Sequence, residues 1–196
     1  MRLTIFALTL ATTFAAATAQ AADTAAAPTR EQIQAAVDAG VAKTKSSVPM
    51  AVKMTSLAGC QPSPEVKEET VCLVGMSAGM RDGFMVLPLR QDAGVWVGVE
   101  RKNAQFPAPA PAEAMALIRA WARDEMAKDP EAAKDKQMQE AATTMQIKSL
   151  NDCDVARKTG YLVCETVLTT PGQSSDIKAQ FSYAFENGAW RYIPRK

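Results

Sequence analysis

The sequence predicts an α+β protein built from two tandem repeats, each a helix packed on a four-stranded antiparallel sheet, with one disulfide bond per repeat. The segment Lys53–Cys60 (KMTSLAGC) recurs 93 residues later as Gln146–Cys153 (QIKSLNDC). Each copy is followed by a second cysteine in an apolar run and then by a Gly-x-Trp motif, and these motifs, which end at Trp96 and Trp190, lie 94 residues apart. A nearly constant offset over several landmarks indicates a duplicated domain.

The N-terminus predicts export. A basic Met1-Arg2 precedes the apolar run Leu3–Ala17 and the small-x-small sequence Ala19-Gln20-Ala21, which together are typical of a cleaved signal peptide. We expect a signal peptide over 1–21, a disordered leader over 22–28, and a mature protein in the bacterial periplasm. No later stretch approaches the roughly 20 apolar residues that a membrane helix needs.

The charges of the mature chain balance. The sequence has 22 Lys and Arg residues, of which Arg2 leaves with the signal peptide, against 21 Asp and Glu residues. A balanced surface gives no electrostatic reason to bind nucleic acid or anionic lipid, and we expect neither as a partner.

All four cysteines lie at repeated positions. In an oxidising compartment an even number of cysteines indicates disulfide bonds. The duplication selects Cys60–Cys72 and Cys153–Cys164, because each copy must have been able to close its own bond. Each bond stabilises the fold by around 3 kcal/mol on the loop-entropy estimate. Free thiols for catalysis or metal binding are the less favoured alternative.

The first repeat is predicted over 29–103. Thr29 and Gln32 have the spacing of a capping box for a helix over 30–45. Alternation from Met50 to Thr55 predicts the first strand, and 61–68 is predicted as a surface loop. The other strands are predicted over 70–76, 84–90 and 95–100. Pro88 has no N–H to donate, so the third strand should be an edge strand or locally irregular there.

The proline-rich segment 104–111 predicts an extended linker to the second repeat at 112–196. We expect a helix that starts near Pro111, an interruption at Pro130, and a second helical piece over 131–142. Strands are predicted over 145–150, 160–169, 179–185 and 189–193, the last two joined by an Asn187-Gly188 hairpin. The two motif tryptophans should be structural anchors, and Trp121 should be buried between the repeats.

The residue content argues against an enzyme. Histidine is absent, which removes the commonest general base and metal ligand, and no serine or lysine nucleophile motif occurs. Paired carboxylates at Asp124-Glu125 and Glu68-Glu69 are the remaining catalytic candidates, but solvated surface charge is the favoured interpretation. We therefore expect a non-enzymatic protein with no catalytic residue, no cofactor and no metal.

Methionines cluster around the predicted turn between the second and third strands, at Met76, Met80 and Met85. Thioethers of this kind could bind Cu(I) in an exported protein. Flexible core filling or an adaptable contact surface is the favoured use. Met76 and Met80, together with Arg81, are the residues that we expect to contact a partner.

The duplicated layout, with one short-range disulfide per copy, resembles the β-lactamase-inhibitory proteins and, more loosely, cystatin-like periplasmic modules. The resemblance carries over no binding residue. It implies two sheets side by side that offer a concave surface to another protein, and hence an inhibitor or immunity-type protein that occludes an exported hydrolase or toxin. One alternative is a carrier that holds a small apolar ligand between helix and sheet, which small residues such as Ala36 and Gly40 leave open. Another is an envelope-assembly module.

Overall fold

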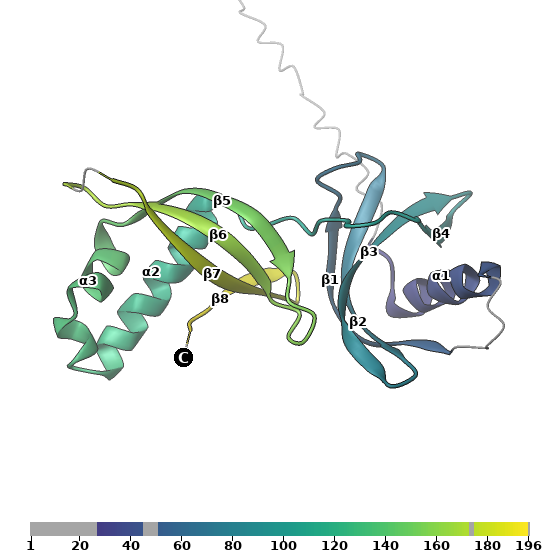
Figure 1. The fold of residues 1–196 in the computed structure, drawn as a ribbon, viewed down its shortest axis with the longest axis horizontal. Helices are drawn as coiled ribbons and strands as arrows, with labels where there is room; N and C mark the ends of the chain where they lie inside the picture. The colour runs from purple at the N-terminus through teal and green to yellow at the C-terminus, as the bar shows by residue number, and fades with distance from the viewer. Residues whose placement is uncertain (1–26, 45–50, 173–174, 196) are drawn as a thin grey trace, which may run out of the picture.

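The computed structural model describes residues 27–44, 51–172 and 175–195, and it has the predicted α+β architecture. Two four-stranded antiparallel sheets follow the orders β1-β2-β3-β4 and β5-β6-β7-β8 (Figure 1). The predicted signal peptide and most of the predicted leader lie outside the described residues. Within those ranges, no helix is long and apolar enough to cross a bilayer.

The first repeat contains one helix and four strands, and the second contains two helices, a short 3-10 turn and four strands. The elements of the first repeat are α1 (Arg30–Lys43), β1 (Val52–Pro62), β2 (Glu69–Ala78), β3 (Arg81–Asp92) and β4 (Val95–Gly98). Those of the second are α2 (Pro111–Lys128), the turn Ala132–Lys134, α3 (Lys136–Thr143), β5 (Gln146–Val155), β6 (Leu162–Thr169), β7 (Ile177–Glu186) and β8 (Ala189–Ile193).

Both predicted disulfide bonds are confirmed. Cys60 and Cys72 are joined across β1 and β2 with an S–S distance of 2.04 Å, and Cys153 and Cys164 across β5 and β6 with 2.06 Å. Each bond lies inside its own repeat, as the duplication requires. No bond joins the repeats among the described cysteines, which are all paired.

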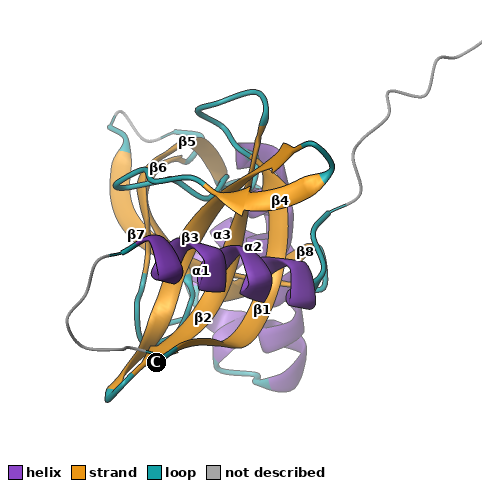
Figure 2. Cartoon of the chain, turned by 90° about the vertical axis from the view of Figure 1, so that its right-hand side faces the viewer, coloured by secondary structure: helices purple, strands orange, loops and turns teal. Residues whose placement is uncertain are grey.

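Helix α1 lies across the first sheet (Figure 2) and is anchored by its N-terminal half. The predicted capping box is present, since Thr29 Oγ1 accepts from the Gln32 N–H and Gln32 Oε1 accepts from the Thr29 N–H. One turn later the Gln34 side-chain amide donates to the carbonyl of Val52 and accepts from the N–H of Met54, at 3.0 and 2.7 Å. These contacts satisfy part of the open edge of β1, an edge that would otherwise invite strand pairing.

Pro88 marks the place where β3 loses its outer neighbour. The pairing of β3 with β4 covers only Leu89 to Asp92, and the next contact is the Val99 N–H donating to the Pro88 carbonyl at 3.0 Å. The N–H and C=O of a strand residue point to the same side, so the missing donor of Pro88 faces the chain leaving β4 and not β2. The predicted irregularity is therefore a change from an interior to an edge strand.

Strand β2 is buried on both of its faces. All six residues from Val71 to Met76 are buried, whereas burial along β6 alternates from residue to residue. Cys72, Val74 and Met76 belong to the core beneath α1. Val71 and Leu73 belong to a second core, which they share with the second repeat. The first sheet is thus packed between its own helix and the neighbouring repeat.

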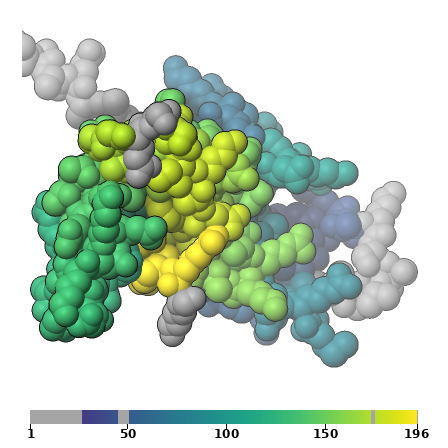
Figure 3. Space-filling model, turned by 60° about the vertical axis from the view of Figure 1, so that its left-hand side comes forward, coloured from purple at the N-terminus to yellow at the C-terminus, as the bar shows by residue number. Residues whose placement is uncertain are grey.

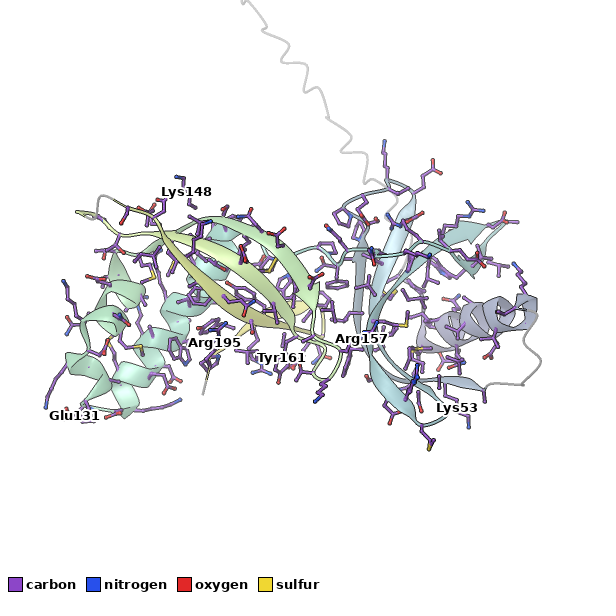
Figure 4. The ribbon with its side chains drawn as sticks, in the orientation of Figure 1. Lys53, Glu131, Lys148, Arg157, Tyr161 and Arg195 are labelled. Atoms are coloured by element: carbon purple, nitrogen blue, oxygen red, sulfur yellow. A yellow bond between two sulfur atoms is a disulfide. The ribbon has the colours of Figure 1, made fainter. Side chains whose placement is uncertain are left out.

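This packing overturns one expectation from the sequence. Two sheets side by side with a common concave face would need the helix-free face of the first sheet to be open. In the part of the chain that the structure describes, that face is covered by the hairpin between β5 and β6 and by aromatic residues of β7 and β8 (Figure 4, where Arg157 and Tyr161 mark the hairpin). The Phe84 N–H donates to the Arg157 carbonyl at 2.7 Å across this junction.

The linker is docked along the second repeat. Phe106, only 2% exposed, packs edge-on against Phe185 and Trp190, with ring centroids 5.3 and 6.0 Å apart. Three residues before the linker, Arg101 forms ion pairs with Glu65 and Glu69 at 2.8 and 2.6 Å. The segment is extended, as predicted, but its one aromatic side chain makes it part of the shared core.

The prediction for Trp121 was wrong, whereas the two motif tryptophans are anchors as expected. Trp96 is 6% exposed and Trp190 is 8% exposed. Trp121 is half-buried inside the second repeat, where its ring packs on Tyr192 at 5.2 Å. It does not lie between the repeats because the junction is built from strands, a hairpin and the linker.

Glycine at position 160 allows the repeats to approach each other, and this can be tested. Gly160 has a φ of +73°, and a Cβ there would lie 2.5 Å from the Phe84 ring. We expect Gly160→Ala to lower the free energy of unfolding by about 2–4 kcal/mol, from backbone strain plus steric overlap. Urea denaturation measures this loss. Gly188→Ala is the matched control, because Gly188 has a φ of +80° with nothing within 4 Å, and equal losses in the two variants would contradict the close approach.

Candidate ligand-binding site

A cleft of about 490 Å³ lies between the C-terminal half of α1 and the first sheet. Its size falls within the roughly 300–1,000 Å³ usual for small-molecule sites. Its wall is mostly apolar, with small residues from the helix and aliphatic or thioether side chains from the strands. The lining residues are Ala36, Val37, Ala39, Gly40, Val41, Lys43, Thr44, Val52, Met76, Met85, Leu87, Val97, Gly98, Val99 and Glu100.

Cross-strand residue pairs at equivalent positions of the two sheets differ, and this difference explains why the cleft exists. In the first sheet Cys72 pairs with Leu87, and in the second sheet Cys164 pairs with Phe181. Since the two cysteines are equivalent, Leu87 occupies the position that Phe181 has in the second repeat. An aliphatic side chain thus stands where the other repeat has an aromatic ring.

The side chains of the next equivalent pair differ even more in size. Leu89 pairs with Gly98 on β4, whereas Tyr183 pairs with Tyr192 on β8. Gly98 therefore occupies the position of Tyr192. In the second repeat the Tyr192 ring packs against Trp121 at 5.2 Å and against Phe181 at 5.6 Å, so three rings fill the space between α2 and its sheet. In the first repeat no side chain extends from Gly98 into that space.

The helix side of the cleft is built from small residues. Ala36 is buried, and a Cβ placed on Gly40 would meet nothing within 4 Å. A Cβ on Gly98 would meet only the Ala36 carbonyl oxygen, at 3.8 Å, which is an ordinary contact distance. The open helix face suggested by the sequence at Ala36 and Gly40 therefore borders a real cleft. Lys43 and Glu100 also line it and supply its charged groups.

The predicted partner-contact residues do not form one surface. Met76 is only 8% exposed and belongs to the core beneath α1, where it lines the cleft. Met80 is fully exposed at the turn between β2 and β3, and Arg81 follows it as the exposed first residue of β3. Met85, about half exposed, lines the cleft together with Met76.

Two other hollows on the surface have more charged residues in their walls, although apolar side chains line much of each. One lies on the opposite flank of α1, and its wall includes Arg30, Asp38 and Lys53. The other lies beside α2 and β8 in the second repeat, on the side shown in Figure 3. Two of its wall residues, Asp124 and Glu125, form ion pairs with Lys128.

The candidate carboxylates lie in solvent or in ion pairs. Asp124 and Glu125 are solvated partners of one lysine, and Glu69 of the other predicted pair is held by Arg101. Over residues 27–44, 51–172 and 175–195, no group of three or more Cys, Asp or Glu side chains is placed to hold a metal ion. The cleft beneath the C-terminal half of α1 is more enclosed than the other two hollows and has fewer charged wall residues, which makes it the best candidate site.

Two tyrosines in the aromatic core of the second repeat have shifted pKa values. Burial raises the pKa of the Tyr183 hydroxyl and that of Tyr192 above the ordinary value. The Tyr183 oxygen is buried without a hydrogen-bond partner in the described part of the chain. Both hydroxyls therefore stay protonated to a higher pH than that of a solvent-exposed tyrosine.

Comparison with known proteins gives no further guide. A scan against protein-family models and a search of curated proteins both returned no match.

The tyrosine pKa shifts predict how stability depends on pH. Above about pH 10 the tyrosines of the unfolded chain ionise, while the raised pKa keeps Tyr183 protonated in the folded state, so the free energy of unfolding should fall with rising pH. Tyr183→Phe should make this fall shallower and change stability at pH 7 by about 1 kcal/mol or less. Denaturant titrations at several pH values measure both effects. Phe181→Leu should lower stability without changing the slope, and an unchanged slope in Tyr183→Phe would contradict the argument.

Proposed function

We propose that the protein is a non-enzymatic, exported binding protein that holds a small apolar ligand in the cleft beside α1. The observation that carries this proposal is the difference between the repeats. The same space is filled by Phe181, Tyr192 and Trp121 in the second repeat and is left open at Leu87 and Gly98 in the first. A protein that needed only a stable scaffold would gain from filling both spaces, because unfilled apolar volume forfeits packing contacts.

The wall of the cleft suits a ligand recognised by shape and apolar contact. Val41, Val52, Leu87 and Val97 provide aliphatic surface. The Met76 and Met85 thioethers are flexible and polarisable, and such side chains adapt to ligands of different shape. Burying the apolar surface of a ligand here would be favourable by roughly 25 cal/mol per Å².

Export to the periplasm is part of the proposal. The apolar N-terminal run and the Ala19-Gln20-Ala21 sequence support export. The two disulfide bonds also support it. Disulfide bonds of this kind form and persist in oxidising compartments.

Protein binding is the second candidate function, in the form of an inhibitor or immunity-type protein or an envelope-assembly module. The observation that favours it is Met80, an apolar side chain fully exposed at the tip of the β2–β3 turn beside the exposed Arg81. Methionine and arginine are enriched in protein interfaces. The contact would be made by this turn, since the face expected to be concave is covered.

Filling the cleft tests the lead proposal. We expect the double variant Leu87→Phe, Gly98→Tyr to lose binding of an apolar fluorescent probe and to gain about 0.5–2 kcal/mol in stability, because it copies the packing of the second repeat. Val95→Tyr is the matched control. It adds a tyrosine to the same strand at a position that is 63% exposed, and it should bind the probe like the wild type.

Native mass spectrometry of protein isolated from periplasm separates the two candidates. The lead proposal expects a bound small molecule that is absent from the filled variant. Unchanged probe binding in the double variant would contradict the lead proposal. Recovery of a stoichiometric protein partner by the filled variant, but not by Met80→Ser, would favour the second candidate instead.

A further inference from the structure

Strand β8 is an edge strand, and in the described part of the chain it pairs with β7 alone. The Asn187-Gly188 turn has φ values of +53° and +80°, as a two-residue type I′ hairpin requires. In such a hairpin the flanking residues Glu186 and Ala189 exchange backbone hydrogen bonds, and pairs of this kind alternate with pairs that have none. The N–H and C=O groups of Trp190 and Tyr192 therefore point away from β7, toward the free edge.

The edge strand β1 shows how this protein covers such an edge. Gln34 of α1 accepts from the Met54 N–H and donates to the Val52 carbonyl. Arg30 donates to the carbonyls of Met54 and Thr55 at 3.1 and 2.9 Å. Helix side chains thus occupy the outward backbone groups of β1.

The free edge of β8 has no such cover. The two arginines nearest to it donate elsewhere, Arg191 to Glu186 at 3.0 Å and Arg195 to Gln180 at 2.7 Å. Over residues 27–44, 51–172 and 175–195, no loop or helix backbone group bonds to its outward groups either. Unpaired backbone groups at a sheet edge are a template for pairing with another chain.

A hollow of about 700 Å³ lies along this edge, between β8 and α2 (Figure 3). On the α2 side it is lined by two partly buried apolar side chains, Leu117 and Trp121, and by two partly exposed carboxylates, Asp124 and Glu125. These four residues form the helix wall of the hollow. Since Tyr192 packs on Trp121, with ring centroids 5.2 Å apart, the helix wall lies beside the free edge.

From this arrangement we propose that the free edge of β8 binds an extended peptide segment of an exported protein, which joins the second sheet as an antiparallel strand. Main-chain hydrogen bonds supply affinity in this binding mode, and contacts with alternate side chains supply specificity. Peptide residues opposite Trp190 and Tyr192 would form hydrogen-bonded pairs with them and would point their side chains toward the helix wall.

The charges of the hollow indicate which peptide fits. Its lining contains three carboxylates, those of Asp124, Glu125 and Glu186, against the single cation of Arg191. The helix wall is otherwise apolar. The side of the peptide that faces α2 should therefore carry apolar residues and at least one basic residue.

A second copy of this chain fits the edge less well than a peptide does. Two β8 strands paired antiparallel about Arg191 would set Trp190 of each copy against Tyr192 of the other. The two Arg191 side chains would then stand directly opposite each other, and like charges in that position are destabilising. This site goes beyond the proposed function, because it lies in the second repeat and shares no residue with the cleft beside α1.

Binding of a fluorescein-labelled, capped heptapeptide to the purified mature chain tests the proposal. The peptide has leucine at its second and sixth positions, lysine at its fourth and threonine at the others. We expect saturable one-to-one binding by fluorescence anisotropy. N-methylation of the two leucines and the lysine should weaken it about tenfold or more, because those N–H groups face β8. N-methylation of three threonines is the matched control and should leave affinity unchanged.

Charge reversal on the helix wall tests the specificity. Asp124→Lys should weaken binding of the peptide about three- to tenfold, and exchange of the peptide's lysine for glutamate should restore part of the loss. Glu131→Lys is the control, since it makes the same change at an exposed residue that follows α2 and lies outside the hollow. It should bind the peptide like the wild type.

Amide hydrogen exchange reports the added strand itself. The peptide should slow exchange at Trp190 and Tyr192 and leave Trp96 and Gly98, the equivalent residues of β4, unchanged. Absence of saturable binding, equal binding of the two N-methylated peptides, unprotected Trp190 and Tyr192 amides, or a dimer formed through β8 in place of the complex would overturn the proposal. The filled variant Leu87→Phe, Gly98→Tyr should bind the peptide normally, so failure of the apolar-ligand proposal remains distinguishable.

Discussion

Burial of β2 on both faces is the constraint on which the rest of the structure depends. Its odd-numbered residues from Val71 to Gly75 face the second repeat, and its even-numbered residues from Cys72 to Met76 face α1. One strand therefore belongs to two cores. Because a pleated strand presents alternate residues to opposite faces, this arrangement uses up both faces of the first sheet. Any ligand or partner of that sheet must bind at its edges, at its turns, or beneath its helix.

The two repeats share one sheet topology but differ in the side chains that lie between each helix and its sheet. In the second repeat a group of aromatic rings occupies the space between α2 and its sheet. In the first, Gly98 and Leu87 stand at the corresponding positions, and α1 is held mainly through its N-terminal half by Arg30 and Gln34. One repeat thus serves as a packed support, and the other keeps an accessible volume at its outer flank.

The candidate carboxylates and the accessible volume have different surroundings. Asp124 and Glu125 both form ion pairs with Lys128, and Glu69 forms one with Arg101. The accessible volume is lined mostly by aliphatic and thioether groups, which recognise apolar surface, and Lys43 and Glu100 are its charged groups.

The sequence by itself determined the features that depend on local pattern. The capping box at Thr29, both disulfide pairings and the β8 boundaries follow from spacing, from the repeat and from alternation, each of which acts between residues close in the chain or at equivalent places. Even the origin of the cleft was visible there, because Gly98 and Leu87 lie 94 residues before Tyr192 and Phe181. Only the tertiary structure decided which faces meet: that the second repeat covers the first sheet, and that Trp121 stays within its own repeat. These contacts depend on long-range packing between apolar faces, and hydrophobic burial is non-directional, so the periodicity that reveals a face does not name its partner.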